Sequence, residues 1–265
     1  MKIRVIVLSI ALFLIGRTCL AAPCATEGFD THVSGESQCL VMRRFGTPEP
    51  EILIVWLHGD VSSGGPANYH FAHAEKAAQT LSSSSVLSVA IVRPGYPDGS
   101  GNSSTVAFLH SGRRDHYTKE NVTEVGVAIE RLRTRFRPKK TIVIGHSGGA
   151  ATTAVLLGLK PGLTDGAVLV ACPCDIAAWR AGRSAWSRSE NPIQWVEKVS
   201  PATRVIAITG GRDDNTLPVL AKAYVDALTA RNVAAEFRLL PNESHNSAIA
   251  SEEVLNAVKE LVASK

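Results

Sequence analysis

Strand-like and helix-like segments alternate along most of the chain. Short runs rich in apolar residues, typical of buried strands, lie at 52–57, 89–92, 141–144, 167–171, 205–209 and 235–240. Segments with the residue spacing of amphipathic or buried helices lie at 67–81, 118–136, 149–159, 217–230 and 247–263. Because strands that alternate with helices form a parallel sheet covered on both faces, the pattern predicts an α/β fold with a mostly parallel sheet.

Two regions interrupt this alternation. Residues 93–102 are rich in Gly and Pro and follow a predicted strand, so we expect an ordered loop beside the carboxyl edge of the sheet. Residues 175–201, here called the lid segment, contain Trp179, Trp186 and Trp195, three of the four tryptophans. The segment is interpreted as a small aromatic lid insertion, or alternatively as a surface helix that its tryptophans anchor to the core.

The first 21 residues have the pattern of an export signal. Lys2 and Arg4 precede an apolar run over 5–15, which is shorter than the ~20 residues of a membrane-spanning helix. Small residues follow, and we expect cleavage after Ala21. The remaining residues 22–265 are long enough for a single domain, with an N-terminal arm over 22–39.

Net charge gives no indication of a polyanionic partner. The full chain carries +4, but the signal holds three of the basic residues and no acidic one, so the exported chain carries +1. Neither nucleic acid nor an acidic membrane surface is expected as a partner.

The exported chain keeps an even number of cysteines: Cys24, Cys39, Cys172 and Cys174. A bridge between Cys24 and Cys39 would fasten the N-terminal arm, which shows no obvious strand. The other two either form a tight local bridge or stay reduced. Lipid attachment at Cys24 is the less favoured alternative, because Pro23 interrupts the residues before it.

The stretch Gly145-His146-Ser147-Gly148-Gly149 carries the clearest chemical signal. It joins the predicted strand at 141–144 to the predicted helix at 149–159. A Gly-x-Ser-x-Gly sequence in that setting is typical of a nucleophile elbow, in which a strained turn projects the serine hydroxyl above the sheet. We therefore interpret Ser147 as a nucleophile.

A serine nucleophile needs a base and an acid that orients the base. Asp213 follows the predicted strand at 205–209, and His245 follows the one at 235–240, so both lie at the carboxyl edge of the sheet. No other histidine lies downstream of Asp213. Asp214, the next residue, and Asp175, after the strand at 167–171, are alternatives for the acid.

From about Leu40 to its end the chain resembles the α/β-hydrolase superfamily, which takes its triad in the order Ser, Asp, His. The resemblance implies a sheet of about eight strands, with Ser147, Asp213 and His245 as nucleophile, acid and base. His58-Gly59-Asp60, after the strand at 52–57, is similar to the oxyanion loop of that family. The backbone N–H groups of Asp60 and Gly148 would then bind the oxyanion.

Asp60 departs from the family pattern, in which small or apolar residues are usual. A carboxylate beside a developing oxyanion is repulsive unless it points away or is paired. We expect the side chain to point outward, capping the helix near residue 67 or bracing its own loop. The alternative, a carboxylate that faces the pocket, would favour substrates with a free amine.

Other histidines have structural interpretations. His58 is expected to brace the oxyanion loop, and His146 to point away from the site and pack between elements. His70 and His73 share one face of a predicted helix but have no third ligand nearby in sequence, so no metal site is expected. Hydrolysis by a triad requires no cofactor.

These patterns predict an exported serine hydrolase that cleaves a small ester, or an amide, through an acyl-enzyme. The alternatives are a serine peptidase that resembles the prolyl oligopeptidase branch, suggested by the loop at 93–96 and the turn at 210–215, and a non-catalytic binding protein on the same fold. Glycosylation sequons stand at Asn102, Asn121 and Asn242. A glycan at Asn242 would obstruct the base, which favours a bacterial periplasmic or secreted enzyme acting on a small ester or short peptide.

Overall fold

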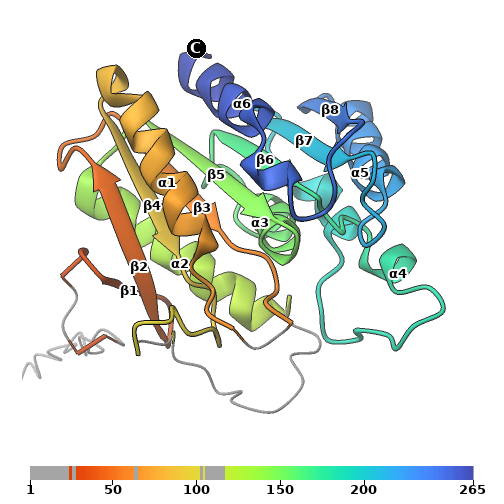
Figure 1. Cartoon of the computed structure of the whole chain (residues 1–265), viewed down its shortest axis with the longest axis horizontal. Coiled ribbons are helices and arrows are strands. Elements are labelled where there is room, and N and C mark those ends of the chain that lie inside the picture. Colours follow the sequence, from red (N-terminus) through yellow and green to blue (C-terminus); the bar gives the residue numbers. More distant parts are fainter. Residues whose placement is uncertain (1–23, 26–27, 63–64, 102–103, 105–116, 265) are drawn as a thin grey trace, which may run out of the picture.

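One mixed sheet organises the molecule (Figure 1). The computed structural model describes residues 24–25, 28–62, 65–101, 104 and 117–264, so the predicted signal over 1–21 lies outside the described part. Its eight strands have the order β1-β2-β4-β3-β5-β6-β7-β8. They are β1 (His32–Ser34), β2 (Cys39–Gly46), β3 (Ile52–Leu57), β4 (Val86–Ile91), β5 (Lys140–His146), β6 (Gly166–Val170), β7 (Arg204–Gly210) and β8 (Ala234–Leu240).

The two pairings that involve β2 are antiparallel, and all the others are parallel. The expected mostly parallel sheet of about eight strands is therefore confirmed. Because β3 to β8 run in the same direction, their carboxyl ends and the loops that follow meet along one edge. This edge carries every residue that the sequence associates with catalysis.

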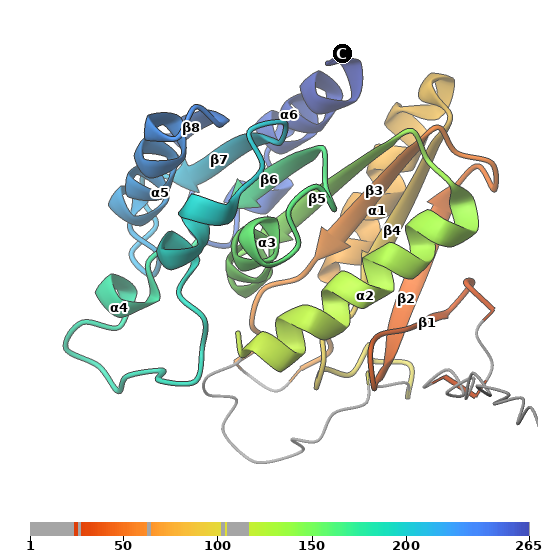
Figure 2. The same cartoon turned by 180° about the vertical axis from the view of Figure 1, so that it is seen from behind.

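Helices cover both faces of the sheet. In Figure 1, α1 (Tyr69–Thr80) and α6 (Glu252–Ala263) lie in front of it. Figure 2 shows α2 (Lys119–Phe136) and α3 (Gly148–Leu159) over the opposite face, beside α5 (Pro218–Ala230). A short helix, α4 (Ile176–Trp179), lies in the lid segment, and 3-10 helices span Ser82–Ser84, Pro192–Lys198 and Ala248–Ala250.

Side-chain alternation along the strands explains the two layers of core. In β3, Ile54 and Trp56 pack into the cluster beneath α1 and α6, while Leu53, Val55 and Leu57 pack beneath α2. Each of these side chains is at most 3% exposed. Full burial of each such side chain stabilises a fold by about 1.5–3 kcal/mol. Because both faces of β3 are buried, its sequence is a continuous apolar run without alternating polar residues.

Two helices begin later in the chain than the sequence pattern predicts. The helix expected from 118 begins one residue later, because Thr118 is its N-cap and its hydroxyl accepts the N–H of Asn121 at 3.3 Å. The helix expected over 247–263 is broken, because Ser251 has an extended backbone (φ −64°, ψ 149°). A 3-10 turn therefore precedes α6.

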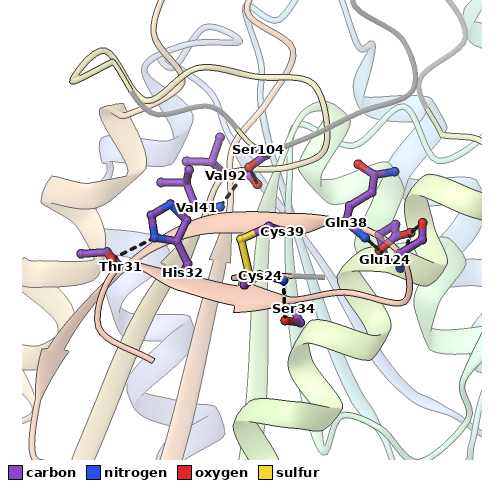
Figure 3. Close-up of a disulfide and its surroundings, with 11 residues drawn as sticks. Cys24, Thr31, His32, Ser34, Gln38, Cys39, Val41, Val92, Ser104 and Glu124 are labelled. Carbon is purple, nitrogen blue, oxygen red and sulfur yellow. Dashed lines mark hydrogen bonds between the residues drawn. A yellow bond between two sulfur atoms is a disulfide. The ribbon is translucent and has the colours of Figure 1, made fainter. Parts of the chain in front are cut away.

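The N-terminal arm is more regular than its sequence suggests. β1 lies within residues 22–39 and pairs with β2, so the expectation of an arm without strands is wrong. A disulfide joins Cys24, which precedes β1, to Cys39 at the start of β2, and the Cys24 N–H donates to Ser34 Oγ at 3.2 Å (Figure 3). The carboxylate of Glu124 on α2 accepts the N–H of Gln38 at 3.1 Å. The turn end of the hairpin is thereby fastened to Cys24 and to α2.

The second disulfide joins Cys172 to Cys174 directly after β6. Among the alternatives left open by the sequence, the structure therefore has the tight local bridge. Both cysteines are fully buried against α3 and β7.

Candidate active site

Ser147 stands at the sharp turn between β5 and α3. Its backbone, with φ of +51° and ψ of −116°, has a conformation that non-glycine residues rarely adopt. The Ser147 N–H donates to the carbonyl of Val170 at 2.8 Å, which ties the turn to the neighbouring strand. The turn is so tight that a Cβ at Gly145 would lie 2.3 Å from the carbonyl oxygen of Gly149. Glycine at that position is therefore a steric requirement of the elbow.

Three strand ends bring the expected nucleophile, acid and base together. Ser147 Oγ lies 2.9 Å from His245 Nε2, and His245 Nδ1 lies 2.9 Å from Asp213 Oδ2. The residues are separated by 98 and 32 positions in sequence. This chain of contacts is the geometry by which an imidazole accepts a hydroxyl proton while a carboxylate orients the ring.

Asp213 is built to remain ionised. It is 3% exposed, and its Oδ1 accepts the N–H groups of Asn215 at 3.0 Å and Thr216 at 2.8 Å. Burial by itself would raise the pKa of Asp213, but the hydrogen bonds from His245 and Thr216 outweigh it and hold the pKa below its ordinary value. A carboxylate in this state can stabilise a positive imidazolium.

The alternative acids are placed elsewhere. Asp214 is exposed and lines the cavity in front of Ser147. Asp175 caps α4, where its Oδ1 accepts the N–H of Ala178 at 3.1 Å and an amide hydrogen of Asn191 at 2.9 Å. Asp213 is thus the carboxylate that the fold brings to His245.

Thr216 is a site residue that sequence reasoning missed. Its hydroxyl lies 2.8 Å from Asp213 Oδ2, 3.1 Å from His245 Nδ1 and 3.0 Å from the carbonyl of Ala171. It lies three residues after the acid in the same turn, and no pattern in the sequence distinguishes it from an ordinary turn threonine.

The side chain of Asp60 points into the protein, so the expectation of an outward-facing side chain is wrong. A Cβ added at Gly148 would lie 2.4 Å from Asp60 Oδ1, which places the carboxylate against the first residue of α3. Oδ1 accepts from the guanidinium of Arg93 and from the hydroxyl of Tyr96 at 3.0 Å, and Oδ2 accepts from Tyr117 at 2.6 Å. The carboxylate is therefore paired, which is the second way to avoid repulsion of an oxyanion.

Burial strengthens this pairing electrostatically. Arg93 is 3% exposed and sits in the Gly- and Pro-rich loop after β4. Burial would lower the pKa of Arg93, but the charge of Asp60 outweighs burial and raises it. Burial and the same carboxylate raise the pKa of Tyr117, which keeps its phenol protonated as a donor. The sequence showed the loop but not that its arginine neutralises Asp60.

The neighbouring histidines position backbone loops. His58 Nδ1 contacts the carbonyl of Gly59 at 2.6 Å, and His58 Nε2 accepts the N–H of Arg93 at 2.9 Å, so His58 braces the oxyanion loop as expected. His146 Nδ1 lies 2.6 Å from the hydroxyl of Tyr69, and its Nε2 donates to the carbonyl of His245 at 2.9 Å. Burial lowers the pKa of His146 to about 4, so the ring is neutral near pH 7.

The two histidines of α1 have different surroundings. His70 is buried, and its Nε2 lies 3.0 Å from the carbonyl of Ile91. His73 stacks on Trp56 at 6.2 Å and lines the cavity. In the part of the chain that the structure describes, no group of three or more His, Cys, Asp or Glu side chains is arranged to hold a metal ion.

A cavity of about 810 Å³ lies in front of Ser147, a volume suited to a small organic ligand. Trp179 and Trp186 of the lid segment line it, and their rings meet edge to face at 5.2 Å. Trp195 instead packs on α3, and its Nε1 donates to Glu190 at 3.1 Å. Two tryptophans therefore fit the lid interpretation, and the third fits the anchoring alternative.

The lid segment is bonded to both sides of the site. Trp179 Nε1 donates to the carbonyl of Asn215 at 2.8 Å. Asn215 lies in the turn over 213–216, here called the acid turn. The N–H of Glu190 donates to the carbonyl of Tyr117 at 2.9 Å, and the hydroxyl of Tyr117 is itself bonded to Asp60.

Among the described helices, none has the length and apolar character to cross a membrane.

Comparison with known proteins gives a family and a fold. Residues 73–263 match the prolyl oligopeptidase family. No curated protein sequence matches the chain. Among solved structures, Est1E from Butyrivibrio proteoclasticus is 13% identical with a TM-score of 0.64, and the alignment covers 88% of this chain and 98% of that one.

Two archaeal structures are also similar. The esterase Pf2001 from Pyrococcus furiosus is 15% identical with a TM-score of 0.63, over 88% of this chain and 90% of that one. The acylaminoacyl peptidase from Pyrococcus horikoshii is 13% identical with a TM-score of 0.62, over 86% of this chain but 39% of that one. Since the family match spans most of the chain and the fold agrees with it, the protein belongs to the prolyl oligopeptidase family and is a serine hydrolase with the α/β-hydrolase fold.

Proposed function

We propose that the protein hydrolyses a small ester through an acyl-enzyme on Ser147, with His245 as base and Asp213 as the orienting acid. The observation that carries this proposal is the continuous contact from Ser147 Oγ through His245 to Asp213, with 2.9 Å at each step. The cavity that opens onto Ser147 supports a small-molecule substrate.

In this mechanism His245 Nε2 takes the hydroxyl proton as Ser147 Oγ attacks the ester carbonyl carbon. The negative charge that develops on the carbonyl oxygen is bound by the backbone N–H groups of Gly148 and Asp60. When the tetrahedral intermediate collapses, the bond to the alcohol oxygen breaks and His245 returns the proton to that oxygen. Water then attacks the acyl-enzyme by the same steps, which releases the acid and restores Ser147.

An ester is favoured over a peptide by the two esterases among the similar structures. Est1E and Pf2001 align with this chain over 98% and 90% of their own lengths, so the whole fold of each esterase has a counterpart here. Short peptides are the second candidate, because the family and the Pyrococcus horikoshii enzyme point to them. Another structure of Est1E holds ferulic acid, so esters of aromatic acids belong among the substrates tested.

The test combines active-site labelling with a substrate panel. A fluorophosphonate probe should label the wild-type protein, and peptide mapping should place the label on Ser147. Ser147→Ala should remove both labelling and turnover, whereas Ser82→Ala, an exposed serine in a surface turn, should change neither. Turnover of p-nitrophenyl esters above aminoacyl p-nitroanilides supports the esterase. The reverse order supports the peptidase, and labelling at another serine contradicts the proposed nucleophile.

We also propose that the protein is exported by a bacterial cell, with residues 1–21 removed. The two disulfides support an oxidising compartment. Asn242 is exposed three residues before His245, where a glycan would crowd the site. Intact mass and N-terminal sequencing of protein recovered from a bacterial periplasm should give a chain that starts at Ala22.

A further inference from the structure

The charged groups that line the cavity do not balance. Asp60 lines it but is already paired with Arg93. Burial lowers the pKa values of His73 and His146, so neither ring adds positive charge near pH 7. Among the described residues, the remaining charges that line it are two guanidinium groups of the lid segment, Arg180 and Arg183, and one carboxylate, Asp214. The cavity therefore has an excess of positive charge on its lid side.

Arg180 is held at the cavity wall by aromatic rings. Its guanidinium carbon lies 5.3 Å from the ring centre of Trp179 and 5.2 Å from that of Trp186, and its Nε donates to the carbonyl of Ser184 at 3.1 Å. These contacts use the Nε–H and place the guanidinium group beside both indole rings. Its two terminal nitrogens make no hydrogen bond or ion pair with the described residues, so they can donate to a ligand.

Arg183 follows three residues later in the turn of the same segment. It is exposed, it lines the cavity, and within the described residues it has no ion pair. By contrast, Arg93 and Arg238 are each paired with carboxylates. Two arginines without carboxylate partners, beside two indole rings, form a surface that suits a planar anion, because a guanidinium group binds a carboxylate through two parallel hydrogen bonds.

We propose that the cavity selects esters that carry a carboxylate in addition to the ester group, with that carboxylate bound by Arg180 and Arg183 beside Trp179 and Trp186. The inference rests on the proposed ester hydrolysis at Ser147 and adds the substrate class. Asp214 has the opposite effect, because its charge opposes an anion in the same cavity.

Two matched pairs of esters test the proposal, one for each side of the ester bond. The acyl pair is the mono-p-nitrophenyl ester of glutaric acid and p-nitrophenyl pentanoate. The alcohol pair is 4-carboxyphenyl butanoate and 4-methylphenyl butanoate. The measured quantity is the ratio of kcat/KM for the anionic ester to that for the neutral ester, and comparison of variants cancels the intrinsic reactivity of each ester.

Arg183→Gln should lower this ratio about 5-fold in at least one pair, and adding Arg180→Gln should lower it about 20-fold in total, mainly through KM. Asp214→Asn should raise the ratio about 3-fold. Arg135→Gln removes the same charge from an exposed position on α2 outside the cavity and should leave the ratio within twofold. Raising salt from 0.02 to 0.5 M should lower kcat/KM for the anionic ester only, roughly 3-fold or more.

Ratios for Arg183→Gln and Asp214→Asn that both stay within twofold of wild type, in both pairs, overturn the proposal. Because Arg183→Gln alters an exposed residue, this outcome does not depend on whether the double variant folds. If none of the four esters is hydrolysed by the wild-type protein, the proposed function itself fails. If neutral esters are hydrolysed and the ratios are insensitive, only the substrate class fails.

Discussion

Asp60 and Arg93 form a buried ion pair directly beside the elbow. The carboxylate carries hydrogen bonds from Arg93, Tyr96 and Tyr117, so its charge is balanced and its position is fixed. A balanced pair does not repel an oxyanion held by nearby N–H groups. It also holds the loop after β3 against the loop after β4 and the first turn of α3.

Asp60→Asn should therefore be strongly destabilising. It leaves the buried guanidinium of Arg93 without its counter-charge, which lowers the free energy of unfolding by about 3–5 kcal/mol. The matched control is Asp30→Asn, which breaks an exposed pair with Arg44 and should cost about 1 kcal/mol or less. Urea unfolding at pH 7 measures both. Equal, small losses in the two variants would show that the buried pair does not hold this loop.

Asp213→Asn should lower kcat on the order of 10⁴-fold, by analogy with the acid of serine-protease triads, because the ring of His245 loses its orienting carboxylate. Asp214→Asn and Asp175→Asn, which alter carboxylates that do not contact that ring, should lower kcat on a neutral ester less than about 10-fold. Steady-state kinetics on p-nitrophenyl pentanoate, with circular dichroism to check folding, makes the comparison. A larger loss at Asp175 would move the acid to the end of β6.

Among the elements, the lid segment connects the two halves of the site. Its first helix is bonded to the acid turn through Trp179, and its middle is bonded through Glu190 to Tyr117, which reaches Asp60. A displacement of this segment would therefore shift both the acid turn and the oxyanion loop. Its short α4 also packs on the core through Ile176, which lies in one apolar cluster with Tyr117 and Ala151.

Trp179→Phe keeps an aromatic ring but removes the indole N–H that donates to the carbonyl of Asn215. Losing one hydrogen bond of about 1 kcal/mol should lower kcat/KM roughly 5-fold and change the melting temperature little. Trp195→Phe removes a similar bond, to Glu190, from a ring that does not line the cavity, so kcat/KM should stay within about twofold. If the two variants lower kcat/KM equally, the bond to the acid turn has no special role.

At the scale of the whole molecule, the disulfide between Cys24 and Cys39 fastens the first strand to the sheet. The bridge closes a loop with a sequence separation of 15, and such a loop contributes about 3 kcal/mol by restricting the unfolded chain. The Cys24→Ser/Cys39→Ser variant should lose about that much in urea unfolding under non-reducing conditions. A variant as stable as the wild-type protein would show that the arm adds nothing to the fold.

Acid should destabilise the fold through two buried histidines. Burial lowers the pKa of His70 to about 3 and that of His146 to about 4, from the ordinary value of 6.5. Between pH 6.5 and about 4 these histidines are protonated in the unfolded chain but still neutral in the folded protein. Their contribution to the free energy of unfolding is therefore complete above pH 6.5 and decreases as pH is lowered. At the low-pH limit the shift of His146 corresponds to about 3 kcal/mol and that of His70 to about 5 kcal/mol.

Urea midpoints at pH 7, 5.5 and 4.5 should decrease in that order. His146→Asn should weaken this pH dependence, because the variant lacks one of the two histidines whose pKa is lowered in the folded protein. If the slope of stability with pH is the same in the variant, His146 is not the titrating group.

Local sequence was enough to predict the elbow and the strands on either side of the site. The strand at 52–57 has the predicted bounds, because it is buried on both faces and its apolar run ends where the glycine turn begins. Ser147 is recognisable because the glycines that permit its backbone lie within two residues of it. Asp213 and His245 could be chosen because the carboxyl ends of parallel strands share an edge, so residues at those ends are neighbours whatever lies between them.

The sequence by itself therefore determined the strand and helix pattern, the elbow and the candidate triad, all of which depend on contacts within a few residues or on strand direction. Only the tertiary structure decided that Asp60 turns inward onto Arg93, 33 residues away, and that Thr216 reaches both Asp213 and His245. It also decided that residues 32–34 pair as a strand. These features depend on which loops and strands lie side by side, and burial selects among polar partners that are equally plausible along the chain.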